Sequence, residues 1–383
     1  MAMNLMDLIC LAAACIWTVI LLLPWRPWAT AEFLDPAPDS GGSDLSDITV
    51  LIPARNEAHL IQATLMGLKA QGRGLKIVLV DDCSVDDTAG AAAACGGEDL
   101  TVVSGEPAPS GWSGKLWALE QGLGHVSTGL ILLLDADIEL RPGLVRTLRT
   151  KMHEEGLHLV SLMAALRMVS FWERLLMPAF IYFFKMLYPF RLSNSTSPLI
   201  AAAAGGCILV ETEVLREIGG FSAIRGELID DCALARLAKS SGRRTWIGLS
   251  HSARSLRSYE DFRPIWNMVA RTAFHQLRYS TLLLLLCTAM MLILFLIPVA
   301  GIFFSSTLSK ILSATALCAM ILTYLPTLRF YGLSWTWATS LTAAGMLYLA
   351  MTWTSAVRYW QGRGSEWKGR AYATGKKGGD TGI

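Results

Sequence analysis

The stretch from Thr281 to Phe304 is apolar almost throughout and contains no charged side chain. A helix of about 20 such residues crosses the hydrocarbon core of a bilayer, so a chain with this segment is expected to fold partly in a membrane. Leu5–Leu23 is a second apolar stretch, and Ile311–Leu328 and Leu333–Val357 are weaker candidates. We therefore expect one N-terminal and two to three C-terminal transmembrane helices.

The first apolar stretch is either a signal peptide or a retained anchor. No Lys or Arg precedes it, Asp7 lies near its start, and no A-x-A cleavage site follows it. Because a signal peptide usually has a positively charged beginning and such a site, we interpret residues 1–28 as an anchor.

Basic side chains predict which parts of the chain face the cytoplasm. Arg26 follows the first apolar stretch, and several arginines precede the second one: Arg254, Arg257, Arg263, Arg271 and Arg278. The middle of the chain is therefore expected in the cytoplasm, on a bacterial inner membrane. The basic tail, 358–383, also predicts an inside location and requires an even number of crossings within 281–357. Either one of the three C-terminal segments is re-entrant or lies in the interface, or the tail is an exception. Ile311–Leu328 is the shortest candidate and contains Pro326, so it is the segment we expect not to cross.

Residues 29–47 are rich in Pro, Gly, Ser and Asp and predict a linker. Short β-rich runs and helical patterns then alternate over residues 48–260. The expected strands are Ile48–Ile52, Lys76–Val80, Leu100–Val103, Leu130–Leu134 and Leu157–Met163. The expected helices between them are Glu57–Gln71, Asp86–Cys95 and Lys115–Gly122. This alternation predicts an α/β domain with a Rossmann-like, mostly parallel sheet covered on both faces.

Carboxylates follow the strongest of these strands, at Asp135, Asp137 and Glu139. In an open α/β sheet, ligands bind beyond the carboxyl ends of the strands. Side chains alternate along an extended chain, so these three would share one side if the chain stays extended. Together they would suit Mg²⁺ or Mn²⁺, which is usually held by one or two carboxylates and substrate phosphates. A solvated turn or a helix cap is the alternative.

Three further groups have both a functional and a structural interpretation. Lys115 opens a helix, where anions are favoured; the structural interpretation is a solvated surface lysine. Asp230 and Asp231 precede a helical pattern, where acidic residues usually cap the helix and where a general base would have to reach an acceptor hydroxyl. His251 is a metal-ligand candidate, although a lone histidine is more often structural. No glycine-rich phosphate loop is present.

Two segments resemble helices that lie in a membrane interface. Residues 171–191 are aromatic-rich with interspersed charges, and residues 261–280 contain a similar pattern just before the second apolar stretch. A buried core helix is the alternative for the first. The eight cysteines show no metal-binding spacing and are expected to be free thiols. The net charge of +2 argues against nucleic acid as a partner.

Over roughly residues 47–280 the chain resembles the family-two glycosyltransferases of the GT-A fold. The matching stretches, in order, are Ile52–Glu57, Val80–Thr88, Gly114-Lys115, Asp135-Ala136-Asp137, Gly205–Phe221 and Asp230-Asp231. Pro109–Ala118 and Arg271–Leu277 are more narrowly similar to the hopene-associated glycosyltransferases of bacterial hopanoid biosynthesis. Related carotenoid glycosyltransferases share the G-W-x-G-K stretch.

The resemblance implies a role for each matching residue. Donor binding falls to Pro53, Arg55, Glu57, Asp81, Asp82, Lys115, Asp135 and Arg271. Metal binding falls to Asp137 and Asp135, with Glu139 and His251 as weaker candidates. The acceptor would lie against Gly205, Gly206 and Cys207, and Asp231, with Asp230 beside it, would be the catalytic base. Asp230 departs from the family, which more often has Glu there.

The Q-x-x-R-W motif of processive polysaccharide synthases is missing from the corresponding stretch, residues 269–274. The expected reaction is therefore a single inverting transfer from a nucleotide-diphosphate sugar, UDP-sugar being favoured, to a hydroxyl of a membrane lipid. A hopanoid is the first candidate acceptor, and a carotenoid or polyprenyl phosphate is the alternative. A transporter or an inert scaffold is the rival from another class; the scarcity of charges in the apolar stretches argues against a transport path.

Overall fold

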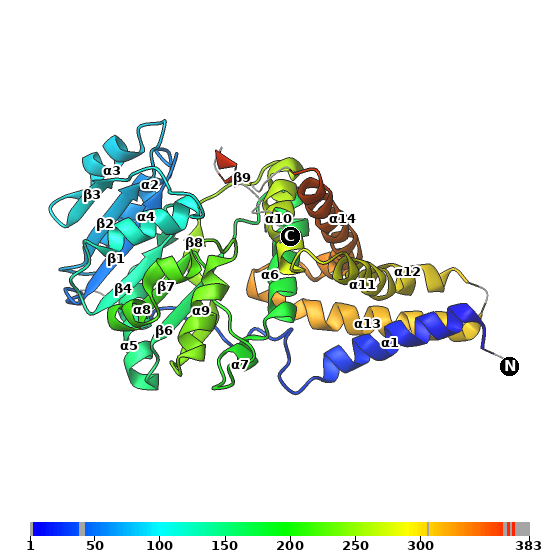
Figure 1. The fold of residues 1–383 in the computed structure, drawn as a ribbon. Helices are drawn as coiled ribbons and strands as arrows, with labels where there is room; N and C mark the ends of the chain where they lie inside the picture. Colours follow the sequence, from blue (N-terminus) through cyan, green and yellow to red (C-terminus); the bar gives the residue numbers. More distant parts are fainter. Residues whose placement is uncertain (1–2, 38–42, 305, 363–365, 368–369, 372–383) are drawn as a thin grey trace, which may run out of the picture. The chain divides into compact units, whose positions relative to one another are not determined.

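The computed structural model describes residues 3–37, 43–304, 306–362, 366–367 and 370–371 (Figure 1). The chain divides into two compact units. The sheet unit comprises Ile20–Glu260 and Leu322–Ala338, and the helical unit comprises Met1–Val19, Asp261–Ile321 and Thr339–Ile383. The two are described separately below.

The sheet unit is built around an eight-stranded sheet with the order β3-β2-β1-β4-β7-β6-β8-β5. The strands are β1 (Ile48–Ala54), β2 (Lys76–Asp81), β3 (Leu100–Ser104), β4 (Leu130–Leu134), β5 (Ile138–Leu140), β6 (Leu159–Ala165), β7 (Cys207–Glu211) and β8 (Thr245–Ser255). β3, β2, β1 and β4 run parallel to one another. β7 is antiparallel to both of its neighbours, β6 and β8 are parallel, and β5 is antiparallel to β8.

Helices bury the sheet on both faces, and alternation along β4 shows how. Leu132 and Leu134 belong to one apolar core, and Ile131 and Leu133 to the other. The first core is closed by α2 (Ile61–Lys69), α3 (Thr88–Gly96) and α5 (Leu144–Glu155). The second is closed by α4 (Gly114–Leu123), α8 (Thr212–Glu217), the 3₁₀ helix η1 (Gly220–Ile224) and α9 (Asp230–Ser240). Because successive side chains point to opposite faces, a continuous aliphatic strand is what burial on both faces requires.

The α/β fold with a mostly parallel sheet is confirmed, and all five expected strands are present, with boundaries shifted by up to two residues. The sequence interpretation missed β5, β7 and β8, and every antiparallel pair of this sheet includes at least one of these strands. β8 contains three serines, an arginine and a histidine, so it does not show the apolar pattern of a buried strand. α2 begins at Ile61 rather than Glu57, because Asn56 adopts a positive φ of 53° and the chain turns before the helix.

Residues 171–191 form α6 (Phe171–Leu187) and the start of α7 (Phe190–Ser193). Ser170 and Glu173 make a capping box at the start of α6, and nine residues of this 17-residue helix are buried. Ile181 packs in an apolar cluster with strands β6 and β8, and the hydroxyl of Tyr182 lies 3.0 Å from that of Thr323. α6 is thus a core helix on one face, while Phe171 and Leu187 are exposed at its ends.

The helical unit contains the remaining elements. They are the first part of α1 (Leu5–Leu22), α10 (Phe262–Gln276), α11 (Thr281–Met291), the π-helical turn η2 (Leu292–Leu296), α12 (Ile297–Ile302), the first part of α13 (Thr307–Phe330), α14 (Leu341–Trp360), β9 (Glu366–Trp367) and β10 (Arg370–Ala371). The 3₁₀ helix η3 (Trp335–Ser340) links α13 to α14. Asp7 of α1 accepts hydrogen bonds from Ser306 and Ser309 at the start of α13, at 2.7 and 2.6 Å. This pairing explains how a carboxylate is accommodated at the start of an apolar helix.

Among the described residues, three helices are long and apolar enough to cross a membrane: Leu5–Leu22, Thr281–Ile302 and Thr307–Phe330. The expectation that the segment with Pro326 does not cross is not supported, because it lies within a helix of 24 residues that meets both criteria. The segment that does not qualify is α14, which packs on α10 in this unit; the Ser355 hydroxyl accepts from Phe274 N at 3.1 Å. Most of the basic tail lies outside the described residues, as does the middle of the linker.

Candidate active site

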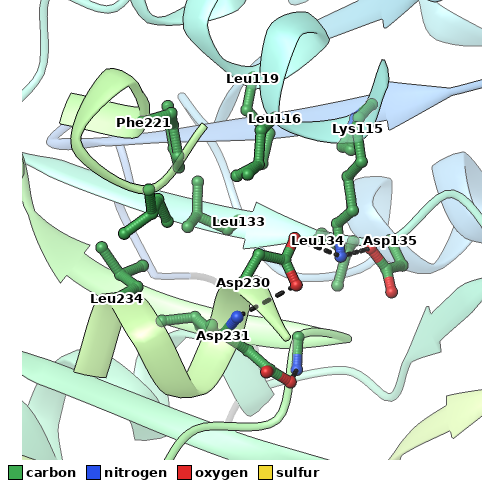
Figure 2. Close-up of a pocket in the computed structure, with 14 residues that line it drawn as sticks. Lys115, Leu116, Leu119, Leu133, Leu134, Asp135, Phe221, Asp230, Asp231 and Leu234 are labelled. Atoms are coloured by element: carbon green, nitrogen blue, oxygen red, sulfur yellow. Dashed lines mark hydrogen bonds and ion pairs between the residues drawn. The ribbon is translucent and has the colours of Figure 1, made fainter. Parts of the chain in front are cut away.

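A pocket opens at the carboxyl end of β4, with a volume of about 330 Å³ that includes space open to solvent. Its polar lining gathers four charged side chains, Lys115, Asp135, Asp230 and Asp231 (Figure 2). The remaining lining is apolar apart from one glycine, and comes mainly from β4, α4, η1 and α9: Pro53, Leu116, Leu119, Leu133, Leu134, Gly205, Ile208, Phe221, Ile224 and Leu234. Charged groups against apolar walls experience a low dielectric, which strengthens the interactions among them.

The Lys115 cluster consists of Lys115, Asp135 and Asp230. Ser113 caps α4 through a hydrogen bond from Leu116 N, which fixes the start of the helix and so the position of Lys115. Lys115 Nζ lies 2.8 Å from Asp135 Oδ1 and 3.8 Å from Asp230 Oδ2, and Figure 2 shows it pointing between them. Burial works against the charged ammonium, but Asp135 and Asp230 outweigh it and raise the pKa of Lys115. Lys115 is therefore a permanent cation in this wall.

Asp231 lies beside this cluster, with a pKa that differs from that of an ordinary carboxyl. Burial, and then the neighbouring charge of Asp230, raise the pKa of Asp231 to about 6. Its two oxygens accept from Gly205 N and Cys232 N, each at 2.7 Å. A Cβ on Gly205 would lie 3.2 Å from Lys115 Nζ and 3.3 Å from Asp231 Oδ2, so glycine is the residue that allows this close approach.

The Arg257 cluster consists of Arg257, Asp137 and Glu57. Arg257 Nε lies 2.7 Å from Asp137 Oδ2, and Arg257 Nη2 lies 2.7 Å from Glu57 Oε1. Burial opposes the charge on Arg257, but Asp137 and Glu57 raise its pKa. The sequence interpretation assigned no site role to Arg257. Pairing of β5 with β8 places it here, because Ile138 is paired with Ser255 and Leu256 N donates to Asp137 O.

The alternation expected for Asp135, Asp137 and Glu139 does not hold. Ile138 N donates to Asp135 O at 3.1 Å, so the chain makes a tight turn at this point instead of staying extended. As a result Asp135 faces Lys115, Asp137 faces Arg257, and Glu139 lies beyond the turn on β5 opposite Arg254 of β8. The structure does not bring Glu139 to the other two carboxylates.

The predicted donor-binding residues divide between the pocket and the loops next to it. Pro53 lines the pocket, whereas the guanidinium of Arg55 donates to the backbone carbonyls of Asp82 and Cys83. Asp81 accepts from Ser84. Asp82 is fully buried, with Arg55 as a neighbour at 4.0 Å. Neither Asp82, predicted to bind the donor, nor Asp137, predicted to bind the metal, is part of the lining of the pocket that contains Asp231.

His251 is not part of either cluster. Its Nδ1 lies 2.8 Å from Asp35 Oδ2 and its Nε2 lies 2.8 Å from Phe330 O, so both ring nitrogens already have partners. Among the described residues, no three His, Cys, Asp or Glu side chains gather as a ready metal site. Arg271 is on α10 in the helical unit. Cys207 begins β7, and burial raises the pKa of its thiol to about 12, which excludes it as a nucleophile near neutral pH.

Comparisons with known proteins show what this chain is similar to. Residues 49–219 match the family model described as glycosyl transferase family 2. This match covers less than half of the chain. The matched region contains β1 to β7, Lys115 and the turn from Asp135 to Asp137. Asp231 and Arg257 lie beyond its end at residue 219.

Two individual proteins are similar to this chain to different extents. The 4,4'-diaponeurosporenoate glycosyltransferase of Staphylococcus aureus (strain bovine RF122 / ET3-1) is 34% identical over 110 residues, which is 28% of this chain and 29% of that protein. The alignment thus spans under a third of the relative's length. The mannosyltransferase PcManGT of Pyrobaculum calidifontis, solved in complex with GDP-Man and Mn²⁺, covers 93% of this chain and 99% of its own at 18% identity, with a TM-score of 0.55. This likeness shows a shared fold.

The two clusters and the turn from Asp135 to Asp137 contain a donor set that suits a hard divalent cation. Asp135 and Asp137 flank one residue at the turn and are close enough for Asp137 to affect the pKa of Asp135, which burial chiefly raises. The two clusters and Asp231 together contain five carboxylates, Glu57, Asp135, Asp137, Asp230 and Asp231, and two cations, Lys115 and Arg257. The excess of negative charge and the oxygen-only ligands at the turn fit Mg²⁺ or Mn²⁺.

Proposed function

We propose that this protein transfers a sugar from a nucleotide-diphosphate donor to a hydroxyl of a membrane lipid, with inversion at the anomeric carbon. The observation that carries the proposal is the position of Asp231: a carboxylate with a raised pKa, held by Gly205 N–H in the same wall as Lys115 and Asp135. A carboxylate with a pKa near 6 is a stronger base than an ordinary one and is still ionised at neutral pH, as general-base catalysis requires.

Each charged group then has a role in the transfer. Asp231 accepts the proton of the acceptor hydroxyl as its oxygen attacks the sugar, and Asp230 maintains the raised pKa. Lys115, fixed at the start of α4, neutralises charge on the donor diphosphate. Asp135 and Asp137 would hold Mg²⁺ or Mn²⁺, which supplies positive charge to the leaving nucleoside diphosphate. Pro53 and Asp81, at the ends of β1 and β2, would contact the nucleoside.

The acceptor is proposed to come from the bilayer. Three helices in the described part of the chain are able to span a membrane, and the flanking arginines favour a cytoplasmic catalytic domain on the inner membrane. The motifs around Trp112 and Arg271 favour a hopanoid. The Staphylococcus relative, named for a 4,4'-diaponeurosporenoate, favours a carotenoid as the second candidate. UDP is the favoured nucleotide by resemblance, and the mannosyltransferase with GDP-Man shows that this fold also accommodates GDP.

The test is a transfer assay with the full-length protein in membranes. A panel of UDP- and GDP-sugars is offered with hopanoid, carotenoid and polyprenyl-phosphate acceptors, and new lipids are identified by mass spectrometry. Asp231→Asn should reduce transfer by about 10²–10⁴-fold, the usual contribution of a general base, while nucleotide binding is retained. Loss of nucleotide binding in this variant would instead assign Asp231 to capping or folding.

The rival from another class makes the opposite prediction. If the domain is an inert scaffold or part of a transporter, Asp137→Ala leaves the cellular function of the protein unchanged. If the protein is a glycosyltransferase, the same substitution removes one of the two carboxylates proposed for the cation and abolishes product formation. Comparing Asp137→Ala with the wild type in the same membranes separates a glycosyltransferase from a scaffold or transporter.

A further inference from the structure

The Arg257 cluster raises a question that the proposed function leaves open. Arg257 binds the carboxylate of Asp137, the residue proposed to hold the divalent cation, through a 2.7 Å contact. The same guanidinium binds Glu57, 2.7 Å away on the loop after β1. A carboxylate oxygen in a close ion pair with arginine is not free for a metal ion. Asp137 can therefore serve a cation in full only after this contact is given up.

We propose that Arg257 is a placeholder: it occupies Asp137 while the cation is absent, and turns to the donor diphosphate when the cation binds. This inference rests on the proposed function for the identity of the donor. Its observations are separate, namely the two contacts of Arg257 and its position in the fold.

The position of Arg257 allows both states. The side chain of Arg257 is 35% exposed, whereas those of Asp137 and Glu57 are 14% and 5% exposed. Arg257 is therefore the member of the cluster that has room to move. Its backbone follows the last residue of β8, and Leu256 N is hydrogen-bonded to Asp137 O. The guanidinium is thus held beside the turn whichever carboxylate it contacts. Guanidinium groups bind phosphates and carboxylates with the same planar set of donors.

Charge explains why a placeholder is useful at this turn. Asp135 and Asp137 repel one another, which contributes to the raised pKa of Asp135. Lys115 neutralises Asp135, and Arg257 neutralises Asp137. Without Arg257, Asp137 would be an unpaired carboxylate whenever no cation is bound. With it, the apparent affinity for a cation is lowered by the fraction of molecules in which Asp137 is occupied.

Arg257→Met tests this in the full-length purified protein, with Mn²⁺ alone as the probe and electron paramagnetic resonance to count free Mn²⁺. Mn²⁺ should bind about tenfold more tightly than in the wild type without nucleotide, because the competing contact is gone. The affinity for UDP or GDP in the presence of Mn²⁺ should fall about tenfold, because a phosphate-binding guanidinium is lost. Tighter Mn²⁺ binding together with weaker nucleotide binding is expected only of a placeholder, since a damaged fold would weaken the binding of both ligands.

Three variants complete the experiment. Asp137→Asn should lose most Mn²⁺ binding, which identifies the titrated site. Arg149→Gln removes one positive charge from the surface pair with Asp47 and should leave Mn²⁺ affinity unchanged. Arg257→Lys keeps the charge without the planar set of donors that bridges two carboxylates, and should bind Mn²⁺ with intermediate affinity. Unchanged or weaker Mn²⁺ binding in Arg257→Met overturns the placeholder.

The outcome is distinct from that of the proposed function. If Mn²⁺ binding tightens as expected but no nucleotide sugar supports transfer by the wild type, the placeholder stands and the transfer proposal fails. If the wild type transfers sugar and Arg257→Met leaves Mn²⁺ affinity unchanged, only the placeholder fails.

Discussion

In both the Lys115 cluster and the Arg257 cluster a long basic side chain lies between two carboxylates, but the surroundings of the two clusters differ. Lys115 and its partners line the pocket with Asp231, and Lys115 is 21% exposed. Arg257 is 35% exposed, and neither it nor its partners are part of the pocket lining. The difference matches the division of work that we propose, with the first cluster serving the reacting groups and the second the exchange of the cation.

The largest effect is expected in the pocket. Lys115→Met removes the cation that faces Asp135 and Asp230, so charge on the diphosphate is no longer neutralised, and transfer should fall about 10²–10³-fold. Initial rates over a range of donor concentrations measure this. Arg149→Gln, which loses a surface cation of α5, is the matched control. A loss no larger than that of Arg257→Met would contradict the division of work between the clusters.

The next effect is on pH dependence. Asp231 acts as base only when ionised, and its pKa is raised to about 6, so transfer should be constant above pH 7 and decline about tenfold per pH unit well below 6. Asp230→Asn removes a charge that raises this pKa, and should therefore move the acidic decline to lower pH. Measuring kcat/KM between pH 5 and 8 for the wild type and for Asp230→Asn tests both expectations. An acidic decline that stays in place in Asp230→Asn would assign the titration to another group.

The two clusters also differ in how far the sequence predicts them. Lys115, Asp135 and Asp231 lie at the ends of strands or helices whose patterns are local, and parallel strands bring their carboxyl ends to one edge. Arg257 depends on the pairing of β5 with β8, across more than a hundred residues, and no local pattern shows it. This register, more than the residue types, separates the predicted part of the site from the missed part.

The surroundings of two predicted residues could not be read from a local pattern. His251 is paired with Asp35, which lies in a stretch rich in proline, glycine and serine that was interpreted as a linker, although Phe33 bridges to Leu249 of β8. Asp81 and Asp82 are adjacent acids at the end of β2, and composition does not distinguish them. Asp82 N donates to Ala54 O, and the Asp82 side chain is fully buried. Both outcomes depend on tertiary contacts.

A smaller effect separates two neighbouring glycines. The Cβ of Gly205→Ala would press on Lys115 Nζ and Asp231 Oδ2 at 3.2 and 3.3 Å, whereas that of Gly206→Ala would meet Ile138 at an ordinary 3.4 Å. Gly205→Ala should therefore reduce kcat about tenfold, the size of a shift of about 1.4 kcal/mol, and Gly206→Ala should reduce it less. Equal losses in the two variants would show that the loop, and not the contact with Asp231, is sensitive.

The smallest effect concerns the second carboxylate that holds Arg257. Glu57→Gln keeps an oxygen acceptor and the hydrogen bond from Glu57 N to Thr88, but it removes the charge that Arg257 Nη2 contacts at 2.7 Å. If Glu57 only helps to anchor the placeholder, the contact with Asp137 loosens slightly and Mn²⁺ binds about two- to threefold more tightly, less than in Arg257→Met. If Glu57 is itself a ligand, Mn²⁺ binding weakens instead. The sign of this change, read by the same resonance titration, decides whether the Arg257 cluster contributes one carboxylate to the cation or two.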